Sequence, residues 1–268
     1  MTSDLSDSVL ALVQEAGERF VRPRFRALAD AEMAEKSPGD WVTIADREAE
    51  TFLESALRAV RPDLPVVGEE AVAADPSVLD VLYPGGSCWL VDPVDGTGNF
   101  VRGDPAYGMA VALVERGEAV ASWIWQPEFG VAWQAEAGAG TFRNGERVRV
   151  GTTAAAISDL RGVFHTRFFP AEQHASMESR PVPYQRTPGS LNSACDYPAL
   201  IEGSIDFICW GRILPWDHAP GSLLLAEAGG VSRRLDGTNY RADATGLGTL
   251  AATTHQAWEL ARSTWPFD

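Results

Sequence analysis

Apolar residues recur at helical spacing near the start of the chain. The first such stretch, residues 5–30, has its apolar positions at Val9, Leu12, Val13, Ala16, Phe20 and Val21. A second stretch, from about Asp46 to Val60, repeats the spacing with Ala49, Phe52, Leu53, Ala56 and Leu57. Positions spaced in this way share one face of a helix. The pattern predicts two amphipathic helices, separated by a turn at Pro38 and Gly39 and a short extended segment.

The middle of the chain has the shorter period of strands. The segments 107–115, 119–127, 131–137 and 140–142 are short and rich in β-branched or aromatic residues. Arg116-Gly117-Glu118 and Asn144-Gly145 are typical hairpin turns. We therefore expect antiparallel strands here, and a further short strand over 64–68 that ends in Glu69 and Glu70.

Helical and strand patterns alternate in the last third of the chain. Residues 151–188 are irregular apart from a possible strand at 160–165. Helices are expected over 191–201, 217–228 and 254–262, and strands over 205–210 and 248–252. Gly229-Gly230 is a good stop signal for the middle helix. We place the boundary between an N-terminal α+β part (1–150) and a C-terminal α/β part (151–268) near residue 150.

Composition narrows the class of protein. The 268 residues carry a formal net charge of −15, which disfavours a nucleic-acid polymer as partner because phosphate binding needs a basic face. No apolar run approaches the roughly 20 residues that cross a bilayer, and no secretory signal is visible. The three cysteines form no paired motif, which favours buried thiols in a reducing, cytoplasmic compartment.

The most informative segment is 89–100. The apolar run Trp89 to Val91 ends in two carboxylates, Asp92 and Asp95, and a hydroxyl follows at Thr97. Carboxylates this close repel one another unless a cation lies between them. An Asp-Gly turn explains one acid but not two, so the pattern favours a hard metal ion with oxygen ligands.

Other acids also stand where predicted strands end or helices begin. They are Asp46, the Glu69-Glu70 pair and Asp217. Each has a structural alternative, because Asp46 and Asp217 could be helix N-caps and Glu69 a solvated turn residue.

A covalent mechanism is disfavoured by Pro93. Phosphatases that form an aspartyl-phosphate use Asp-x-Asp-Gly-Thr, but the residue two before Asp95 is Pro93. Asp92 is displaced by one position, which turns it to the other face of a strand. The remaining possibility is a metal-activated water that attacks a phosphoryl group.

At this point the chain resembles the inositol monophosphatase family, within the lithium-sensitive, magnesium-dependent phosphatase superfamily. The matching motifs are collinear along nearly the whole chain. They are Lys36-Ser-Pro-x-Asp-x-Val-Thr-x-x-Asp46, Gly68-Glu69-Glu70, Trp89-x-Val-Asp-Pro-x-Asp-Gly-Thr-x-Asn-Phe-x-x-Gly103, Asn144-Gly145, Gly189-Ser190, Pro215-Trp216-Asp217 with Gly221, and Glu227-Ala228-Gly229-Gly230. The resemblance implies an α+β fold, the layered α-β-α-β-α sandwich of the inositol monophosphatase and fructose-1,6-bisphosphatase type.

The resemblance also implies a set of metal ligands. Glu69, Asp92 and the Val94 carbonyl would hold one Mg²⁺. Asp92, Asp95 and Asp217 would hold a second. A third, weaker ion would sit near Glu69 through water, so two to three ions per site are expected.

Catalytic and substrate roles follow from the same resemblance. Thr97, paired with Asp46, would orient and deprotonate the attacking water, and Glu69 belongs to the catalytic set. Backbone N–H groups of Gly96 and Thr97 would cradle the phosphate, with Lys36 nearby unless it is an exposed loop lysine. Gly189 and Ser190 would be substrate contacts of the C-terminal part. Lithium inhibition and a homodimer are further implications.

The chain differs from the family at positions where family members contact the substrate. Inositol phosphatases carry an acid seven positions before the last metal-binding Asp, and here that position is Trp210. An indole donates hydrogen bonds but cannot accept them, so Trp210 could stack on a ring, fill the pocket, or pack in the core. Arg212 could pair with a second anionic group. The small residue usual after Gly-Ser is Leu191, and His165, Arg167, Phe168 and Phe169 could border the pocket.

These features lead to one main hypothesis and several alternatives. The main hypothesis is a magnesium-dependent phosphomonoesterase of a small sugar, polyol or nucleotide-type phosphate, acting without a membrane or nucleic-acid partner. Histidinol phosphate, 3′-phosphoadenosine 5′-phosphate and fructose 1,6-bisphosphate are alternatives to an inositol phosphate. The alternative from another class is a metal-dependent protein that binds a phosphorylated metabolite without useful catalysis.

Overall fold

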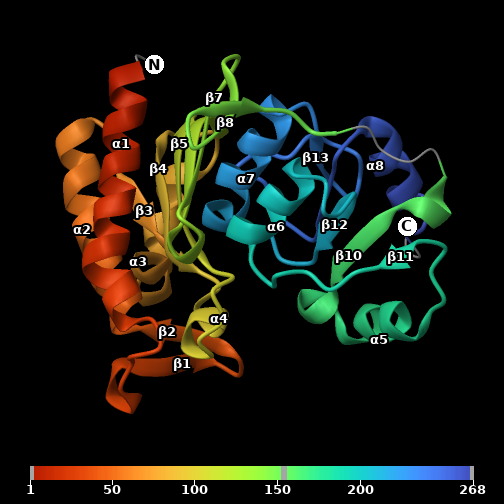
Figure 1. Cartoon of the computed structure of the whole chain (residues 1–268), viewed down its shortest axis with the longest axis horizontal. Helices are drawn as coiled ribbons and strands as arrows, with labels where there is room; N and C mark the ends of the chain where they lie inside the picture. The colour runs from red at the N-terminus through yellow and green to blue at the C-terminus, as the bar shows by residue number, and fades with distance from the viewer. Residues whose placement is uncertain (1–2, 152–155, 266–268) are drawn as a thin grey trace.

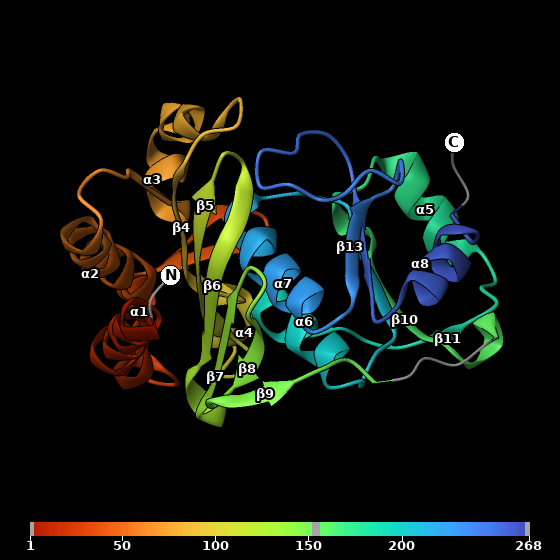
Figure 2. The same ribbon diagram turned by 90° about the horizontal axis from the view of Figure 1, so that it is seen from above.

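Two large β-sheets and three layers of helices make up most of the molecule, and a two-stranded sheet completes it (Figure 1). The computed structural model describes residues 3–151 and 156–265. Helices α1 (Ser3–Ala16) and α2 (Ile44–Val60) cover one face of a seven-stranded sheet. Helices α6 (Ser193–Ile201) and α7 (Pro215–Glu227) lie between this sheet and a five-stranded sheet. Helices α5 (Ala171–Ser179) and α8 (His255–Arg262) cover the outer face of the five-stranded sheet (Figure 2). The layered α-β-α-β-α fold expected from the sequence is confirmed.

The first sheet is mostly antiparallel. Its order is β3-β4-β5-β6-β7-β8-β9, and only β3 (Val66–Gly68) runs parallel to its neighbour β4 (Cys88–Asp95). The other strands are β5 (Gly108–Glu115), β6 (Glu118–Gln126), β7 (Val131–Glu136), β8 (Gly140–Arg143) and β9 (Glu146–Val148). Both predicted hairpin turns are confirmed, since they join β5 to β6 and β8 to β9.

The first predicted helix is too long and the second begins earlier than expected. After α1 the chain continues as a π-helical turn over 17–21 and a 3₁₀ turn over 22–24, so the range 5–30 is wrong. Pro23 lies in that 3₁₀ turn, where its missing N–H and its ring oppose further α-helix. The N-cap of α2 is Thr43, and Asp46 is the third helical residue, so Asp46 is not the N-cap.

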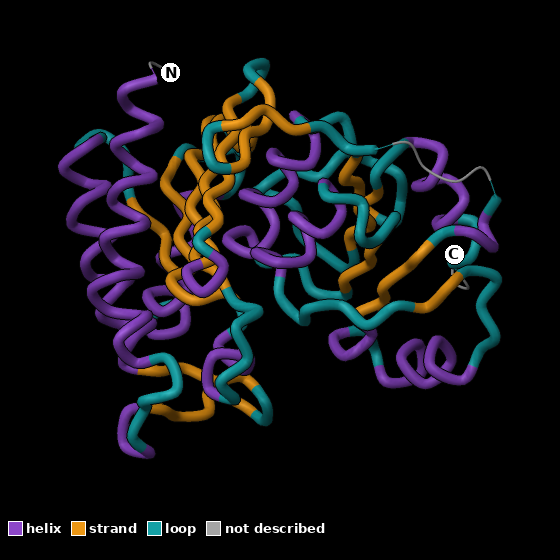
Figure 3. Tube along the Cα trace, viewed as in Figure 1, coloured by secondary structure: helices purple, strands orange, loops and turns teal. Residues whose placement is uncertain are grey.

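A β-hairpin lies beneath the ends of the first-layer helices (Figure 3). Strand β1 (Met33–Ser37) pairs antiparallel with β2 (Asp40–Thr43), as the turn signal at Pro38 and Gly39 predicts. Gly39 has a φ of 74°, a left-handed conformation that glycine adopts without steric cost. The hairpin leads directly into α2 on one side and presents Lys36 and Asp40 near the carboxyl end of β4.

The second sheet has the order β11-β10-β12-β14-β13. Its strands are β10 (Arg161–His165), β11 (Gln185–Arg186), β12 (Phe207–Trp210), β13 (Val231–Arg234) and β14 (Thr249–Ala252). Sequence reasoning missed α5, β9, β11 and β13. Strand β13 reads Val-Ser-Arg-Arg and α5 buries only Met177, so neither carries a clear apolar period.

Helix α7 is buried on nearly every side because it packs against both sheets. Its buried residues include Leu223, Leu224 and Leu225, which join the apolar core shared with α6 and strands of both sheets. Its N-cap is Leu214, so Asp217 is the third helical residue and not a cap. Among the described residues, no helix is both long and apolar enough to cross a membrane.

Close packing of α7 on α6 generates a stability prediction. A Cβ placed on Gly221 would lie 2.0 Å from the ring of Tyr197. Gly221→Ala should therefore lower the free energy of unfolding by about 1–3 kcal/mol, as overpacking does. Gly151→Ala is the matched control, since a Cβ there meets no atom within 4 Å. Urea unfolding of both variants is the measurement, and equal stability of the two would contradict tight α6–α7 packing.

Candidate active site

A cleft of about 370 Å³ opens where the carboxyl end of β4 meets the start of α7. Acidic side chains line it from both halves of the chain. Those predicted as metal ligands are Glu69, Asp92, Asp95 and Asp217, and Val94 lines the same cleft. Thr97, the first residue of α4 (Thr97–Val101), lies among them.

A break in the strand register brings both β4 acids to the cleft. Asp92 pairs with Ala110 on β5, but Asp95 pairs with Gly108, so β4 carries one extra residue between them. Side chains three apart on a regular strand point to opposite faces. The bulge removes that conflict, so the expectation that Asp92 turns to the other face of the strand is wrong.

The two acids differ in their hydrogen bonding. The Asp95 carboxylate accepts hydrogen bonds from Ser193 Oγ at 2.6 Å and Ala194 N at 2.5 Å. Asp92 is buried, and its Oδ1 has no hydrogen-bond partner among the described residues. A buried carboxylate oxygen without a partner is costly, so Asp92 is the acid most in need of a ligand.

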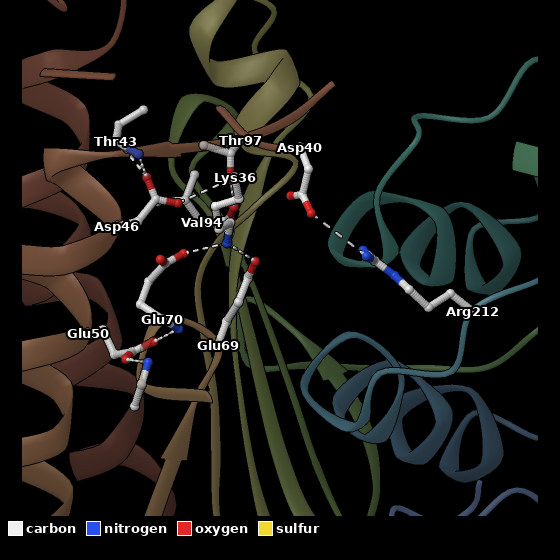
Figure 4. Close-up of polar contacts among 11 residues, drawn as sticks. Lys36, Asp40, Thr43, Asp46, Glu50, Glu69, Glu70, Val94, Thr97 and Arg212 are labelled. Atoms are coloured by element: carbon white, nitrogen blue, oxygen red, sulfur yellow. Dashed lines mark hydrogen bonds and ion pairs between the residues drawn. The ribbon is translucent and has the colours of Figure 1, made fainter. Parts of the chain in front are cut away.

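Asp46 and Thr97 are joined by a hydrogen bond inside the first half. Asp46 Oδ2 accepts from Thr43 N at 2.8 Å and from Thr43 Oγ1 at 2.5 Å, which completes a capping box at the start of α2 (Figure 4). Its other oxygen lies 3.1 Å from Thr97 Oγ1, and that hydroxyl lies 2.9 Å from the Val94 carbonyl. The helix cap thus fixes the carboxylate that faces Thr97.

Lys36 is paired rather than exposed. Its Nζ lies 2.7 Å from Glu69 Oε1 and 2.8 Å from Glu70 Oε1 (Figure 4). Burial lowers the pKa of Lys36, but the two carboxylates outweigh burial and raise it above its usual value. The ammonium therefore stays charged and offsets part of the negative charge beside the cleft.

Sequence reasoning missed Glu50, which fixes the backbone that carries Glu69. Its carboxylate accepts hydrogen bonds from Glu70 N at 2.8 Å and Ala71 N at 2.7 Å, at the start of α3 (Glu69–Ala74). A Cβ on Gly68 would lie 2.3 Å from this carboxylate, so only glycine fits there. The glycine before Glu69 was the one available signal for such a close approach.

Burial and repulsion between carboxylates raise the pKa values of five acids in and beside the cleft, namely Asp46, Glu50, Asp92, Asp95 and Asp217. Burial raises the pKa of Asp46 to about 7, and that of Glu50 to about 7, against the opposing hydrogen bonds. The pKa values of Asp92 and Asp217 lie well above their usual range because of burial and of the neighbouring carboxylates. The pKa of Asp95 is raised by burial despite its hydrogen bonds. The cleft therefore favours either protons or a cation.

The carboxylates of the cleft are suitable ligands for a hard cation, although they are not arranged as a preformed metal site. Within residues 3–151 and 156–265, no three Asp, Glu, His or Cys side chains converge closely enough to form a preformed metal site. Glu69 is held by Lys36 instead. Yet the orphaned Asp92 oxygen and the surrounding carboxylates are the oxygen ligands that Mg²⁺ prefers. The residues fit the ion, with a rearrangement of Glu69 required on binding.

Some of the predicted substrate-binding residues line the cleft and others do not. Gly96, Thr97, Trp210 and Arg212 line the cleft. Four other predicted site residues are absent from its lining, namely Lys36, Asp46, Gly189 and Ser190. Asp46 and Lys36 reach the cleft through Thr97 and Glu69, respectively.

Trp210 has two of the three environments that the sequence left open, since it packs in the core and borders the pocket. It is 7% exposed and stacks on Tyr197 with ring centroids 4.8 Å apart. Its ring also meets His218 edge-on at 5.0 Å, while one side of the residue lines the cleft. Trp210 is therefore a packed core aromatic that also forms part of the cleft wall.

Leu191 stands exposed in a strained conformation at the cleft. It is 68% exposed and has a φ of 66°, which non-glycine residues rarely adopt. Its neighbour Asn192 caps α6 by accepting from Cys195 N at 2.9 Å, and Asn192 also donates to the Ala106 carbonyl at 2.7 Å. This chain-bridging cap holds Leu191 in place.

Comparison with known proteins shows that the chain is similar to one protein family along nearly its whole length. Residues 4–265 match the model of the inositol monophosphatase family. The chain is 31% identical over 243 residues to the inositol-1-monophosphatase of Rhizobium meliloti, covering 88% of this chain and 87% of that protein. It is 33% identical over 211 residues to the fructose-1,6-bisphosphatase/inositol-1-monophosphatase of Thermotoga maritima, covering 78% and 77%.

Other relatives carry a different name, and solved structures agree in fold. The Nus factor SuhB of Escherichia coli is 31% identical over 223 residues, covering 78% of each chain. The structure of a Thermotoga maritima IMPase superposes with a TM-score of 0.78 at 26% identity, covering 98% of each chain. An inositol monophosphatase from Zymomonas mobilis gives a TM-score of 0.79 at 24% identity, covering 98% and 97%.

The buried contact of Glu50 with α3 yields a second prediction. Glu50→Ala should lower the free energy of unfolding by about 1–3 kcal/mol, because two backbone N–H groups lose their acceptor. Glu54→Ala is the control on the same helix, since Glu54 pairs only with exposed Arg58 and should cost about 0.5 kcal/mol or less. Chemical denaturation measures both. A Glu50 effect as small as that of Glu54 would show that the α3 start is held by other contacts.

Proposed function

The chain belongs to the inositol monophosphatase family, and we propose that it is a magnesium-dependent phosphomonoesterase of a small phosphorylated metabolite. Family membership supports a phosphatase. The observation that carries the proposal is the orphaned, buried Asp92 oxygen in a cleft lined by four further carboxylates, those of Asp40, Glu69, Asp95 and Asp217. Such a site is stable when ionised only if a cation shares it.

We assign the ligands from the residues at the cleft. Glu69, Asp92 and the Val94 carbonyl would hold one Mg²⁺, and Asp92, Asp95 and Asp217 a second. A third ion near Glu69 belongs to the same proposal. When bound, the ions supply Lewis acidity to the phosphoryl group and activate water. Lys36 would release Glu69, since the two are paired in the absence of metal.

Thr97 and Asp46 would handle the proton of the attacking water. Thr97 Oγ1 lies within hydrogen-bond reach of Asp46 Oδ1 at 3.1 Å, so the hydroxyl can donate to Asp46 while its lone pair accepts from water. Burial raises the pKa of Asp46 to about 7, which suits a proton acceptor near neutral pH. Thr43 holds the carboxylate in position from the other side.

The phosphate would bind beside the same residues. Gly96 and Thr97 line the cleft at the start of α4, and their backbone N–H groups would bind phosphate oxygens. Gly96 has a φ of 90°, and a Cβ there would lie 2.9 Å from the Asn192 amide, so glycine is needed at this turn. Lys36 would contribute positive charge from behind Glu69.

The substrate, the assembly and the compartment are parts of the proposal that family membership leaves open. Relatives are named for inositol phosphate, for fructose bisphosphate and as Nus factors. An inositol phosphate, histidinol phosphate, 3′-phosphoadenosine 5′-phosphate and fructose 1,6-bisphosphate all remain candidates. Lithium sensitivity, a homodimer and a cytoplasmic location are proposed with them. Phosphate release from this panel with Mg²⁺ tests the enzyme; a folded, Mg²⁺-binding protein that hydrolyses none of them is a metabolite-binding protein instead.

Two substitutions separate catalysis from metal binding. Thr97→Ala should lower kcat by about 10²- to 10⁴-fold, because the proton path through Asp46 is lost, while Mg²⁺ affinity changes little. Asp95→Asn should lower both. Thr97→Ser keeps the hydroxyl and should restore most activity, and Thr51→Ala, at an exposed hydroxyl on α2, is the control. Turnover and calorimetric Mg²⁺ titration are the measurements; normal kcat in Thr97→Ala would refute the assigned role.

The raised pKa values predict how pH affects the metal-free protein. Asp46 and Glu50 keep protons in the folded state up to about pH 7, whereas the unfolded chain releases them near pH 4. Their stabilising contribution is full below pH 4 and is lost as pH rises through 7. The free energy of unfolding of metal-free protein should therefore fall by at least about 1 kcal/mol between pH 5 and pH 8.

Mg²⁺ should oppose this trend, because it binds the cleft acids more tightly once they have lost their protons. The rise in Tm on adding Mg²⁺ should be larger at pH 8 than at pH 5, with NaCl of equal ionic strength as control. Asp46→Asn should flatten the metal-free pH profile. A Tm shift that is the same at both pH values would argue against cation binding by these carboxylates.

A further inference from the structure

The cleft wall formed by the second half of the chain presents hydrogen-bond donors. Its polar side chains include His165 at the end of β10, Arg167 in the turn that follows, Trp210 at the end of β12, and Arg212. Arginine and the indole of tryptophan donate but cannot accept. This wall therefore contrasts with the acidic residues of the cleft, which accept.

Arg212 is held in an extended position with unused donor capacity. Its Cζ lies 4.2 Å from the centre of the Phe168 ring, a cation–π contact that orients the guanidinium. Its Nη1 approaches Asp40 only to 4.0 Å, across the cleft from the hairpin (Figure 4). The Arg212 carbonyl accepts from His218 Nε2 at 2.9 Å, which fixes the backbone. Its Nε is buried without a partner among the described residues.

His165 is oriented by a buried carboxylate. Its Nε2 lies 2.8 Å from Asp196 Oδ2, and the other Asp196 oxygen accepts from Ser190 N at 2.7 Å. A Cβ on Gly189 would lie 2.9 Å from His165 Cε1, so the missing side chain makes room for the ring. Gly189 and Ser190 thus act on the cleft through His165. Because Nε2 is occupied by Asp196, Nδ1 is the ring nitrogen left to contact a substrate group.

The hydroxyl and amide oxygens on this side of the cleft belong to buried residues, namely Thr166, Asn192 and Ser193. Thr166 Oγ1 donates to Glu178 at 2.6 Å, and Ser193 Oγ donates to Asp95. The Asn192 oxygen caps α6. Asp40 and Asp217 are acids near Arg212, and Asp40 approaches its guanidinium to 4.0 Å. Neutral sugar hydroxyls, which must donate as well as accept, find few acceptors here.

We propose that this wall is a subsite for a second anionic group, contacted by Arg212 and bordered by His165, and that the substrates are phosphomonoesters bearing a distal phosphate or carboxylate. The inference rests on the proposed phosphatase function and narrows it. A neutral polyol phosphate leaves the donors unsatisfied, and a cationic amino alcohol phosphate is repelled by Arg212. A distal anion would replace Asp40 as the partner of Arg212 and satisfy its free N–H groups.

Matched substrate pairs test the subsite. Fructose 1-phosphate against fructose 1,6-bisphosphate adds a distal phosphate, and glucose 6-phosphate against 6-phosphogluconate adds a distal carboxylate. Histidinol phosphate supplies the cationic case. In the native protein with Mg²⁺, kcat/KM should be at least about 10-fold higher for the anionic member of a pair, and lowest for histidinol phosphate. A preference in the bisphosphate pair alone assigns the subsite to phosphate, and a preference in both pairs assigns it to anions generally.

Variants locate the preference on named residues. Arg212→Gln keeps side-chain length and polarity but removes the charge, and should lower the anionic-to-neutral ratio by about 10-fold or more. His165→Gln should lower the ratio less, since the Asp196 contact can persist. Arg180→Gln, at an exposed arginine that ends α5 outside the cleft, is the control and should keep the native ratio. Circular dichroism and Tm establish that each variant is folded.

The outcomes separate this inference from the proposed function. Turnover of the neutral esters with a native ratio near or below 1 overturns the subsite and leaves the phosphatase standing. A ratio in Arg212→Gln equal to that in Arg180→Gln also overturns it. If no ester is hydrolysed, the proposed function fails, and calorimetric affinities for the same pairs decide the subsite on the same ratios.

Discussion

Repulsion among buried carboxylates at the end of β4 is the constraint on which the rest of this structure depends. Asp92, Asp95 and Asp217 share one cleft, and burial together with their neighbours raises their pKa values. The surrounding chain holds these groups in place without neutralising them all. Lys36 offsets Glu69 and Glu70, and Ser193 with Ala194 binds Asp95. Asp92 has no such partner at Oδ1. The energetic deficit is concentrated on one oxygen, which is the arrangement that a bound cation would relieve.

Assembly of that cleft depends on packing between the two halves of the chain. Asp217 lies in the first turn of α7, and α7 is buried between the two large sheets. Within that layer, Gly221 of α7 packs against Tyr197 of α6. The N-terminal end of α6 delivers Ser193 and Ala194 to Asp95 on β4. The same two helices therefore provide core packing and place polar groups at the acids. Loosening of α6 or α7 would change the distance between Asp217 and the acids of β4, so stability and site geometry are coupled here.

The sequence predicted the local chemistry better than the connections that support it. The acids of β4, the partner acids and the layered fold were all accessible from motifs, because each motif lies in a short stretch with a strong pattern. The bulge between Asp92 and Asp95 was not, since it is defined by pairing with β5. In the sequence, Glu50 is one more polar residue of an amphipathic helix, because its hydrogen bonds to the backbone of α3 depend on tertiary structure. Asp46 and Asp217 were open to interpretation as caps, and the helices begin earlier than either. The boundary near residue 150 and the metal roles stay predictions.

In the proposed function, selectivity and reaction chemistry would draw on different parts of the chain. The acids and Thr97 lie on regular elements with strong sequence signatures, whereas Arg167 and Phe168 lie in the stretch that sequence reasoning left irregular. Replacing an acid by Trp210 does more than delete an acceptor, because the indole packs on Tyr197 and His218, and His218 in turn holds the Arg212 carbonyl. An acid at position 210 would lose that aromatic stack and would place a negative charge near Arg212. The donor character of the wall is therefore built into the packing of β12 and α7, and a change of substrate class would require several of these residues to change together.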